Sequence, residues 1–354
     1  MRSFDVVIVG TGGIAGVHAG DYARLGGRAK VVAAVEVDAD RLRGFSEKFE
    51  IPRTYSSLEQ MLASEDPDVI DLCTPPGLHR DQALACLADS RTVLCEKPPA
   101  LSLIELDDIA AAGGSFATIS QHRFGSGAVN LRRMLAAGDL GRPMTAVCHT
   151  LWYRPDDYFR VPWRGKWELE GGGPTMGHGI HQMDLMLSIL GPWREVVATA
   201  ARQARPTATE DLSCAIVTFE NGAMATVVNS LLSPRETSYL RFDFEHATVE
   251  LEHLYGYQDK SWRITADPDR TQAWQAMPAG VSSGHSAQFA AVFDALEAKA
   301  PPPVTLPDAR MTLELIAAIY ASAFTGRSVR RGEIGPRSPF YQRMDGSGAP
   351  WERA

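Results

Sequence analysis

The stretch Val6-Val7-Ile8-Val9-Gly10-Thr11-Gly12-Gly13-Ile14-Ala15 decides the fold. Its β-branched half predicts a buried strand, and its glycines fit the pattern G-x-G-x-x-A at the start of a helix. Gly10 permits a tight turn and Gly12 lets the backbone approach a pyrophosphate, while Gly13 and Ile14 begin a helix whose N-terminus favours negative charge. A purely structural turn is the alternative, but the strand-loop-helix context favours a dinucleotide site.

The residues that follow alternate short β-branched runs with helical patterns. Strands are predicted at 5–9, 31–37, 69–73, 92–95 and 116–120, and helices at 58–63, 79–88 and 102–112. Ser57 precedes the first of these helices, and Gln60 follows three residues later, which is the spacing of a capping box. This alternation predicts an α/β fold, with an N-terminal Rossmann domain over residues 1–121 that contains a doubly wound parallel sheet.

The pattern changes after residue 121. Helices are predicted at 129–137, 180–190, 286–299 and 309–324, and strands at 212–220, 223–230, 239–244 and 248–254. Asn221-Gly222 between two of the strands predicts a hairpin with a type I′ turn. We therefore expect a C-terminal α+β domain over residues 122–331, with a large, open, mostly antiparallel sheet. The Pro- and Gly-containing tail over 332–354 is expected to be loosely held.

Composition restricts the partners. The chain has 354 residues, 45% of them hydrophobic, and a net charge of −8, which argues against nucleic acid as a ligand. Its start lacks the long apolar run of a signal peptide, and no segment approaches the roughly 18 apolar residues of a membrane span. The five cysteines are widely spaced and odd in number, so we interpret them as reduced thiols of a cytoplasmic protein that does not contact a membrane.

Glu36 closes the second predicted strand, at the place where an acidic side chain accepts hydrogen bonds from the adenosine ribose. Its charge would repel a 2′-phosphate, so NAD is the expected cofactor. Arg41 and Arg43 in the following helix could reach such a phosphate and keep NADP as the alternative. Glu36 could also be a solvated carboxylate at a strand end.

Lys97 ends the apolar strand of Val93-Leu94-Cys95-Glu96-Lys97-Pro98. Moving an ammonium group out of water costs several kcal/mol unless its charge is used or its pKa falls. Lys97 is therefore a candidate for proton handling at a reacting centre. The alternative is a structural cation that pairs with Glu96.

Together these features resemble the Gfo/Idh/MocA family of NAD(P)-dependent oxidoreductases, which is named after glucose-fructose oxidoreductase and inositol dehydrogenase. The resemblance covers residues from about 4 to 330. The matching pieces are Gly10 to Ala15, Thr74-Pro75 with His79, Glu96-Lys97-Pro98, Arg123-Phe124, Trp163-Arg164, Gly171-Gly172-Gly173 followed by His181 and Asp184, and Ala318-Ile319-Tyr320-Ala321-Ser322.

The resemblance implies a dehydrogenase or reductase that acts on CH–OH groups. Hydride would pass between the nicotinamide and a hydroxyl-bearing carbon of a sugar, cyclitol or related polyol. It also implies a homodimer or homotetramer that assembles through the sheet of the C-terminal domain. Two other activities remain: a redox-neutral, NAD-dependent enzyme that cleaves glycosides, and a cofactor-binding regulator without turnover.

The resemblance also implies roles for individual residues. His181 would transfer the proton, and Lys97 would stabilise the same substrate oxygen. The expected cofactor-binding residues are Gly10, Gly12, Gly13, Ile14, Glu36, Thr74, Pro75, His79, Glu96, Lys97, Trp163 and Arg164. The expected substrate residues are Arg123, Trp163, His178 and Asp184. His178, His181 and Asp184 recur every three residues, as metal ligands can, but we expect no metal.

One position departs from the family pattern. The resembling enzymes commonly carry Asp or Asn four residues before the catalytic histidine, and this chain has Gly177 there. The usual orienting partner of His181 is therefore missing. Either His178, one residue later, or a carboxylate from elsewhere in the chain takes its place.

Overall fold

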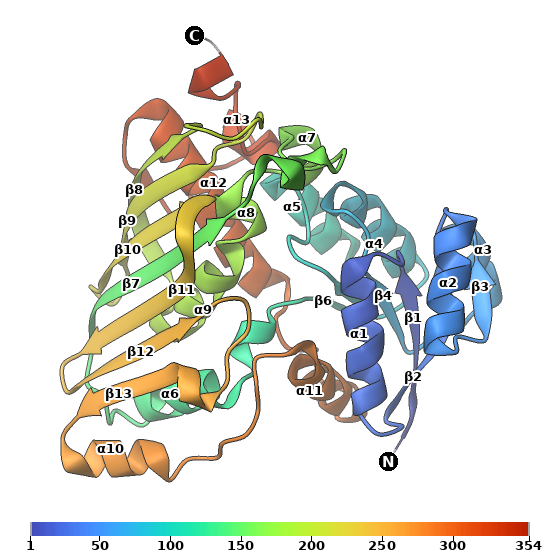
Figure 1. Ribbon diagram of the computed structural model, residues 1–354, viewed down its shortest axis with the longest axis horizontal. Coiled ribbons are helices and arrows are strands. Elements are labelled where there is room, and N and C mark those ends of the chain that lie inside the picture. The colour runs from blue at the N-terminus through green and yellow to red at the C-terminus, as the bar shows by residue number, and fades with distance from the viewer. Residues whose placement is uncertain (1, 353–354) are drawn as a thin grey trace. The chain divides into compact units, whose positions relative to one another are not determined.

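The computed structural model describes residues 2–352, which form two compact units. The first unit contains the chain up to Ala100, together with Glu105–Ile119 and Gly284–Ala309. The second contains Leu101–Ile104, Ser120–Ser283 and the chain from Arg310 onward (Figure 1). The switch near residue 120 lies close to the predicted boundary at 121, but the chain returns to the first unit later, which the sequence did not indicate.

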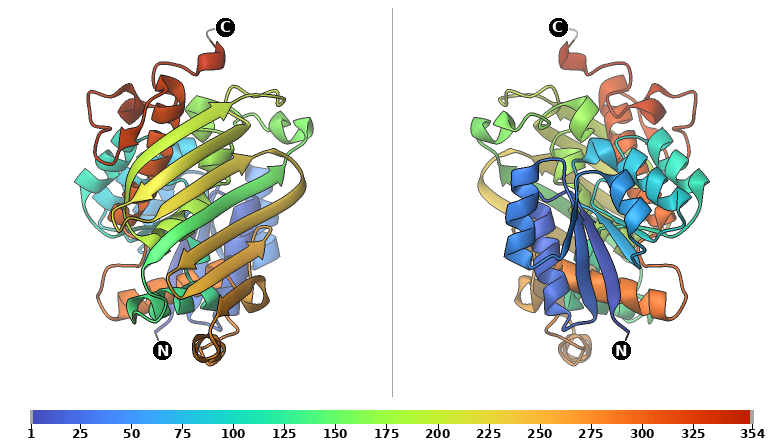
Figure 2. Two further views of the ribbon diagram at one scale, coloured as in Figure 1. Left: turned by 90° about the vertical axis from the view of Figure 1, so that its left-hand side faces the viewer. Right: turned by 90° about the vertical axis from the view of Figure 1, so that its right-hand side faces the viewer.

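The first unit is built on a six-stranded sheet that is parallel, as predicted, although its edge strand at residues 53–55 was not among the five predicted strands. Its strands are β1 (Phe4–Val9), β2 (Ala29–Val35), β3 (Arg53–Tyr55), β4 (Val69–Leu72), β5 (Val93–Cys95) and β6 (Phe116–Thr118), in the order β3-β2-β1-β4-β5-β6 (Figure 2). The order reverses between β1 and β4. In such sheets a ligand binds outside the carboxyl ends of the strands at this switch point.

Helices connect these strands. They are α1 (Gly13–Arg24), α2 (Ala39–Phe49), α3 (Leu58–Ser64), α4 (His79–Ala88) and α5 (Leu103–Ala112), with a short 3-10 turn η1 (Pro76–Leu78) before α4. Asp38 caps α2 by accepting hydrogen bonds from Asp40 N and Arg41 N. Ser57 Oγ accepts from Gln60 N at 3.3 Å, so the predicted cap of α3 is confirmed.

Helix α11 (His285–Glu297) completes the core of the first unit, although we expected this segment to close the second domain. Phe289 stacks on Tyr22 with ring centroids 4.2 Å apart, and Phe293 stacks on Phe4 at 4.7 Å. All four side chains are at most 1% exposed. The apolar face of α11 therefore packs against α1 and β1, which explains why the chain returns.

The second unit contains an eight-stranded, mostly antiparallel sheet, as predicted. Its strands are β7 (Pro143–Tyr153), β8 (Trp193–Ala201), β9 (Leu212–Phe219), β10 (Met224–Ser230), β11 (Leu232–Phe244), β12 (Ala247–His253), β13 (Trp262–Ala266) and β14 (Val329–Arg330), in the order β13-β12-β11-β7-β10-β9-β8-β14. Among the described strands of this second sheet, only β10 and β7 form a parallel pair.

Helices of the second unit cover one face of this sheet, and none of that unit's described helices lies over the centre of the other face (Figure 2). The remaining elements are α6 (Ser126–Ala136), α7 (Trp167–Glu170), α8 (Pro174–Gly177), α9 (Ile180–Leu190), α10 (Pro268–Gln275), α12 (Leu306–Thr325) and the 3-10 turns η2 (Gln121–Arg123), η3 (Asp156–Arg160) and η4 (Asp259–Ser261). Ser188 is the only residue of α9 that is not buried, because the helix is enclosed on nearly all sides.

The hairpin between β9 and β10 exists, but its predicted type I′ turn is wrong. That turn needs positive φ at both central residues, whereas only Gly222, at φ +90°, has it. Gly222 N donates to Phe219 O, and Phe219 N donates to Ala223 O, so the loop is one residue longer. Asn221 Nδ2 instead donates to Leu190 O at the end of α9, and this tertiary bond explains the different turn.

The described part of the tail, residues 332–352, is not loosely held, contrary to the prediction. It contains α13 (Pro339–Gln342) and a 3-10 turn η5 (Pro350–Glu352). Phe340, Tyr341 and Met344 are 7%, 8% and 2% exposed, respectively. These apolar side chains anchor the segment despite its glycines and prolines.

All five cysteines are unpaired. Within residues 2–352, no helix combines the length and hydrophobicity needed to cross a membrane.

Candidate functional site

The predicted glycine loop joins β1 to α1. Gly10 has φ +87°, and a Cβ there would lie 2.9 Å from Thr74 Cγ2, so both backbone and space require glycine. A Cβ at Gly12 or Gly13 would meet nothing within 4 Å. Gly12 caps α1 without a side-chain hydrogen bond, which leaves the N-terminal N–H groups of α1 facing this open space. The loop thus fits a dinucleotide phosphate, and half-buried Ile14 begins the helix behind it.

Glu36 follows β2 and folds back onto this loop. Its Oε2 accepts hydrogen bonds from Thr11 N at 3.1 Å and Thr11 Oγ1 at 3.2 Å, and its Oε1 accepts from Val37 N at 2.9 Å. Burial alone would raise the pKa of Glu36, but these donors and the N–H of Asp38 outweigh it, so the pKa lies below its ordinary value. An ionised carboxylate here suits ribose hydroxyls and repels a phosphate.

The two arginines that kept NADP open are engaged within α2. Arg41 Nε lies 3.1 Å from Asp38 Oδ2, and Arg43 Nη2 lies 2.6 Å from Asp40 Oδ1. Each guanidinium group therefore already has a carboxylate partner. Both pairs are exposed and hold the arginines only weakly, so the preference for NAD rests on Glu36.

His79 connects the loops that follow β4 and β5. Its ring nitrogens lie 2.8 Å from Pro98 O and 2.8 Å from Thr74 O, and its side chain is fully buried. Burial lowers the pKa of His79 despite these two carbonyl groups. Thr74 Oγ1 also donates to Gln82. His79 thus holds the Thr74-Pro75 loop beside the loop that carries Lys97, and a direct contact of its ring with the cofactor stays a prediction.

Lys97 lies just after β5, at the carboxyl end of the parallel sheet, as expected. It is half-buried rather than fully buried, whereas the preceding Glu96 is 5% exposed. Glu96 Oε2 accepts the backbone N–H of Lys97 at 3.0 Å. The Glu96 carboxylate is thus bonded to the backbone of Lys97.

The glycine triplet of the second unit is packed against a buried carboxyl group. Glu210 accepts hydrogen bonds from Gly173 N at 3.0 Å, Thr175 N at 3.1 Å and Tyr320 Oη at 2.8 Å. A Cβ on Gly173 would lie 2.0 Å from Glu210 O, and one on Gly172 would lie 2.2 Å from Tyr320 Oη. Burial raises the pKa of Glu210 to about 7. These contacts fix the start of α8 and explain the need for glycine.

His178 and His181 follow in the α8–α9 segment. His181 is the second residue of α9 and is 5% exposed, and its ring centroid lies 5.1 Å from that of His122. Gly179 precedes α9 and packs on Asn229 of β10, since a Cβ there would lie 2.0 Å from Asn229 Oδ1. His178 Nε2 lies 3.2 Å from Tyr158 Oη. The structure thus places both histidines in buried, aromatic surroundings.

Arg123 and Asp184 form a buried, bidentate ion pair. Arg123 Nε and Nη2 each lie 2.7 Å from an Asp184 oxygen, and Thr312 Oγ1 donates to Asp184 Oδ1 at 3.2 Å. The two charged residues are 9% and 4% exposed. Because the guanidinium and the carboxylate use their hydrogen-bonding groups on each other, this geometry favours a structural role. Their contact with the substrate stays a prediction.

Trp163 and Arg164 are both half-buried, with the Arg164 guanidinium 4.4 Å from the centre of the Trp163 ring. Arg164 Nη1 also contacts Tyr158 Oη and lies 3.5 Å from Glu170 Oε1. The guanidinium therefore connects Glu170 to Tyr158, and Tyr158 in turn contacts His178.

Sequence reasoning missed Glu170. Its carboxylate is buried, Oε2 accepts the N–H of Gly165 at 2.6 Å, and Oε1 lies 3.6 Å from the place of a Cβ on Gly177. A carboxylate from another part of the chain thus lies beside the position where the expected acidic residue is missing. The only signal in the sequence was an acidic residue just before the glycine triplet, with Glu168 two positions earlier.

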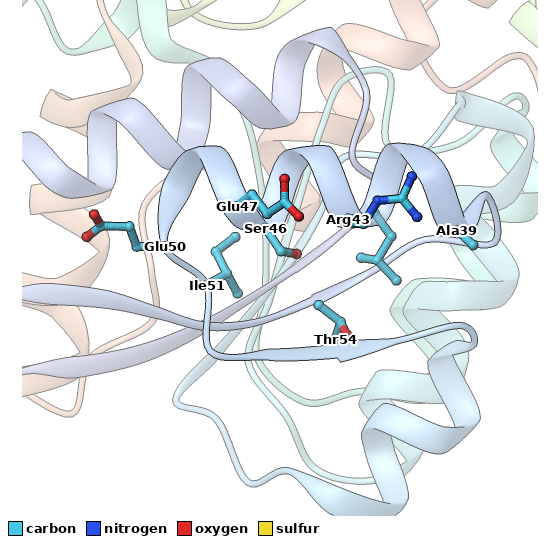
Figure 3. Close-up of a pocket in the computed structure, with 8 residues that line it drawn as sticks. Ala39, Arg43, Ser46, Glu47, Glu50, Ile51 and Thr54 are labelled. Carbon is cyan, nitrogen blue, oxygen red and sulfur yellow. The ribbon is translucent and has the colours of Figure 1, made fainter.

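A separate hollow lies between α2 and β3 (Figure 3). It is lined by Ala39, Leu42, Arg43, Ser46, Glu47, Glu50, Ile51 and Thr54, and none of the predicted site residues belongs to it. The hollow between α2 and β3 is therefore not the predicted cofactor or substrate site. The expectation that the protein needs no metal stays a prediction.

Comparison with known proteins gives family matches in both units. Residues 4–114 match the family described as "Oxidoreductase family, NAD-binding Rossmann fold", and residues 128–250 match the "GFO/IDH/MocA C-terminal domain". The chain is 26% identical to a D-glucoside 3-dehydrogenase of Escherichia coli, over 92% of this chain and 96% of that protein. It is 24% identical to a 1,5-anhydro-D-fructose reductase of Ensifer adhaerens, over 84% and 90%.

Solved structures share the fold over nearly the whole chain. The WlbA dehydrogenase of Bordetella pertussis, in complex with NADH and UDP-GlcNAcA, is similar with a TM-score of 0.83 and 26% identity. The match covers 93% of this chain and 99% of that one. A levoglucosan dehydrogenase in complex with NADH has a TM-score of 0.82 at 17% identity, which shows the common fold.

Proposed function

Because this chain belongs to the Gfo/Idh/MocA oxidoreductase family, we propose that it transfers hydride between NAD and a hydroxyl-bearing carbon of a sugar, cyclitol or related polyol. The names of its relatives, a glucoside dehydrogenase and an anhydrofructose reductase, support this substrate class. One observation carries the proposal. The glycine loop after β1 and Lys97 after β5 lie at the same carboxyl edge of one parallel sheet, around its switch point.

The bound nicotinamide would accept or donate the hydride. Gly12, Gly13 and Ile14 would hold the phosphates at the start of α1, and Glu36 would bind the adenosine ribose. Thr74 and Pro75, held by His79, would border the nicotinamide half. The expected contacts of Glu96, Trp163 and Arg164 with the cofactor belong to the same proposal.

Lys97 would hydrogen-bond the substrate oxygen and stabilise its alkoxide character, and His181 would move the proton. Trp163 offers an apolar ring face to a pyranose, and His178 offers a polar edge. Arg123 and Asp184 would act indirectly, through the ion pair that joins η2 to α9. A cytoplasmic location agrees with the five free thiols.

A homodimer or homotetramer would form through the open face of the sheet. Val197, Ile216 and Met224 on β8, β9 and β10 are 54%, 51% and 50% exposed. Val197 and Ile216 are direct cross-strand partners, so their apolar surface is continuous. Sedimentation of the protein, compared with its Ile216→Lys variant, tests this assembly.

A substrate screen tests the activity. Purified protein is incubated with NAD or NADP and a panel of methyl glycosides, free aldoses and cyclitols, and nicotinamide absorbance reports turnover. We expect reduction of NAD with at least one polyol and no turnover in a Lys97→Ala variant that still binds NAD. Full turnover in that variant would refute the role of Lys97. Release of an aglycone without net NADH would identify the glycoside-cleaving alternative, and NAD binding without any turnover would identify a regulator.

A further inference from the structure

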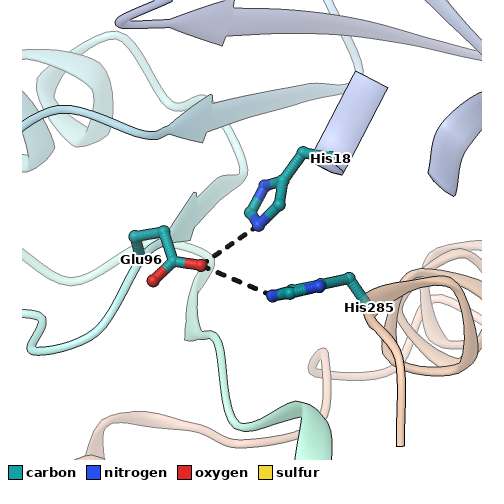
Figure 4. Close-up of side chains that lie close together, drawn as sticks. All are labelled: His18, Glu96 and His285. Carbon is teal, nitrogen blue, oxygen red and sulfur yellow. Dashed lines mark hydrogen bonds and ion pairs between the residues drawn. The ribbon is translucent and has the colours of Figure 1, made fainter. Parts of the chain in front are cut away.

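Three ionisable side chains from distant parts of the chain meet inside the first unit. His18 Nδ1 on α1 lies 2.8 Å from Asp71 Oδ2 on β4. His18 Nε2 lies 3.1 Å from Glu96 Oε1 after β5, and Figure 4 shows this contact together with His285. The exposed fractions of His18, Asp71 and Glu96 are 0%, 0% and 5%. Neither His18 nor Asp71 belongs to the expected cofactor or substrate residues, so this cluster needs its own explanation.

The geometry favours the charged form of His18. A neutral imidazole has one N–H group, whereas both ring nitrogens of His18 face carboxylate oxygens, which only accept hydrogen bonds when ionised. Both contacts are satisfied together when His18 is an imidazolium ion. Burial alone would lower the pKa of His18, but Asp71 and Cys73 hold it well above its ordinary value.

Glu96 extends the cluster to Lys97. While Oε1 faces His18, Oε2 accepts the backbone N–H of Lys97 at 3.0 Å. Burial alone would raise the pKa of Glu96, but its contacts with His18 and His285 and the charge of Lys97 hold it well below its ordinary value. At the other end, Tyr22 Oη donates to Asp71 Oδ2 at 2.8 Å, so that carboxylate is also held in place.

We propose that His18 is a positioning residue for Lys97, because its imidazolium ties Glu96 to Asp71 and Glu96 holds the backbone at Lys97. This inference rests on the proposed function, in which Lys97 contacts the substrate oxygen. The positive charge of His18 also offsets part of the negative charge of Asp71 and Glu96, which it contacts. Without it, Glu96 would lose its anchor, and its charge would act on Lys97 uncompensated.

The surroundings of His18 decide how the cluster titrates. Asp71, Cys73 and Glu96 contact the ring of His18, the ring of His285 lies against it, and Tyr22 contacts Asp71. The His18 and His285 ring centroids are 4.6 Å apart. His285 Nε2 lies 3.6 Å from Glu96 Oε1, and its Nδ1 lies 3.7 Å from Asp21 Oδ2. Helix α11 thus covers the cluster with a second histidine.

A metal ion would be a different explanation for the same side chains. Ligand atoms of His18, Glu96 and His285 lie within 4.8 Å of one another. A metal on His18 Nε2 would replace the proton that the proposal requires there. The two explanations therefore exclude each other, and metal analysis of the purified protein separates them.

The test compares His18→Gln, Glu96→Gln and a control, His246→Gln, in the full-length protein with NAD and the best polyol of the screen. His246 is an exposed histidine of the second unit. We expect His18→Gln to lower kcat about tenfold to a hundredfold, as loss of a supporting hydrogen-bond partner does at other sites. The KM for NAD should change much less, and His246→Gln should change neither.

The pH profile of kcat/KM shows whether His18 acts on Lys97 or only on folding. Removing the positive charge of His18 favours the ammonium form of Lys97, so the limb due to Lys97 should move to higher pH. Removing the negative charge in Glu96→Gln should move it to lower pH. Because the two variants remove charges of opposite sign, the limb should shift in opposite directions in the two profiles.

Two further measurements keep the proposal falsifiable if a variant fails to fold. In the wild-type protein labelled with ¹⁵N-histidine, we expect one histidine whose two ring N–H groups persist above about pH 8. Neutral rings throughout at that pH, stoichiometric bound zinc, or unchanged pH profiles in both variants would overturn the role of His18. A Lys97→Ala enzyme that keeps the same alkaline limb would instead overturn the assignment of Lys97 itself.

Discussion

Substituting Gly177 tests whether the Glu170 carboxylate occupies the place of the missing acidic residue. A Cβ on Gly177 would meet only Glu170 Oε1 within 4 Å, at 3.6 Å, so a small side chain fits sterically. Gly177→Asn and Gly177→Asp have nearly the same shape, and they differ in charge. Any difference between them therefore reports the electrostatic effect of Glu170.

The expected size follows from the geometry. A carboxylate on residue 177 would place its charge about 4 to 5 Å from that of Glu170, which at an effective dielectric constant of 20 corresponds to about 3 to 4 kcal/mol of repulsion. Arg164 Nη1, 3.5 Å from Glu170 Oε1, offsets part of this. We expect Gly177→Asp to be about 2 to 3 kcal/mol less stable than Gly177→Asn near neutral pH.

Urea unfolding followed by fluorescence measures this difference. In a Glu170→Gln background the repulsion is absent, so the Asn and Asp variants of Gly177 should become equally stable. The difference should also shrink as the pH falls from about 6 to about 4, because the repulsion raises the pKa of one of the two carboxylates above its ordinary value in the folded protein. In the enzyme assay, Glu170→Gln with Gly177→Asp should turn over faster than Glu170→Gln alone.

Equal stability of the two Gly177 variants in the wild-type background would refute this reasoning, because no negative charge would then lie beside residue 177. A difference that persisted in the Glu170→Gln background would refute it as well. It would show that another acidic group, and not Glu170, faces Gly177.

Three further predictions concern binding and stability. Gly10→Ala should weaken NAD binding by about tenfold or more in calorimetry, because φ +87° and the contact at 2.9 Å with Thr74 force the loop to move. Asp184→Ala should cost about 3 to 5 kcal/mol in urea unfolding, since it leaves the Arg123 guanidinium buried without its carboxylate. Burial raises the pKa of Glu210 to about 7, so the native state retains a proton that the unfolded chain loses above its ordinary pKa of 4.5. Stability should therefore fall between about pH 5 and 7 more steeply in the wild type than in Glu210→Gln.

Matched controls exist for these predictions. Gly20→Ala lies on the same helix as the cofactor loop, in open space, and should leave NAD binding unchanged. Glu252→Ala breaks an exposed pair with Arg235 and should cost at most about 0.5 kcal/mol. A similar loss for Asp184→Ala and Glu252→Ala would contradict the buried-pair argument. Parallel pH curves for the wild type and Glu210→Gln would show that Glu210 does not titrate in this range.

The Rossmann sheet could be predicted because its signals are local. Each strand is a short β-branched run bounded by turn residues, and the parallel order follows from the intervening helices. The limits of His79–Ala88 and Ile180–Leu190 agree with the predicted helices. The sequence was insufficient to predict a turn whose geometry depends on tertiary contacts. Asn221 by itself suits a type I′ turn, but its hydrogen bond to Leu190 O accompanies a different loop.

The candidate site divides in the same way. Gly10, Glu36 and Lys97 could be found because their chemistry depends on position relative to a strand, which the sequence shows. Glu170 could not be found, because its importance depends on a distance to Gly177 that no sequence spacing encodes. The ion pair of Arg123 could not be predicted either, because its partner Asp184 is 61 positions away in the sequence.

The cofactor-binding unit is not a continuous piece of the chain, and this has a physical consequence. Phe289, Val292 and Phe293 of α11 are at most 1% exposed in its core, and burying three such side chains contributes roughly 5 to 9 kcal/mol before opposing terms. That is comparable to the whole stability of many domains. A fragment that ends near residue 120 would lose these contacts and would expose Phe4 and Tyr22. The segment that stabilises the nucleotide-binding core also places His285 beside Glu96, so packing and the setting of Lys97 depend on the same helix.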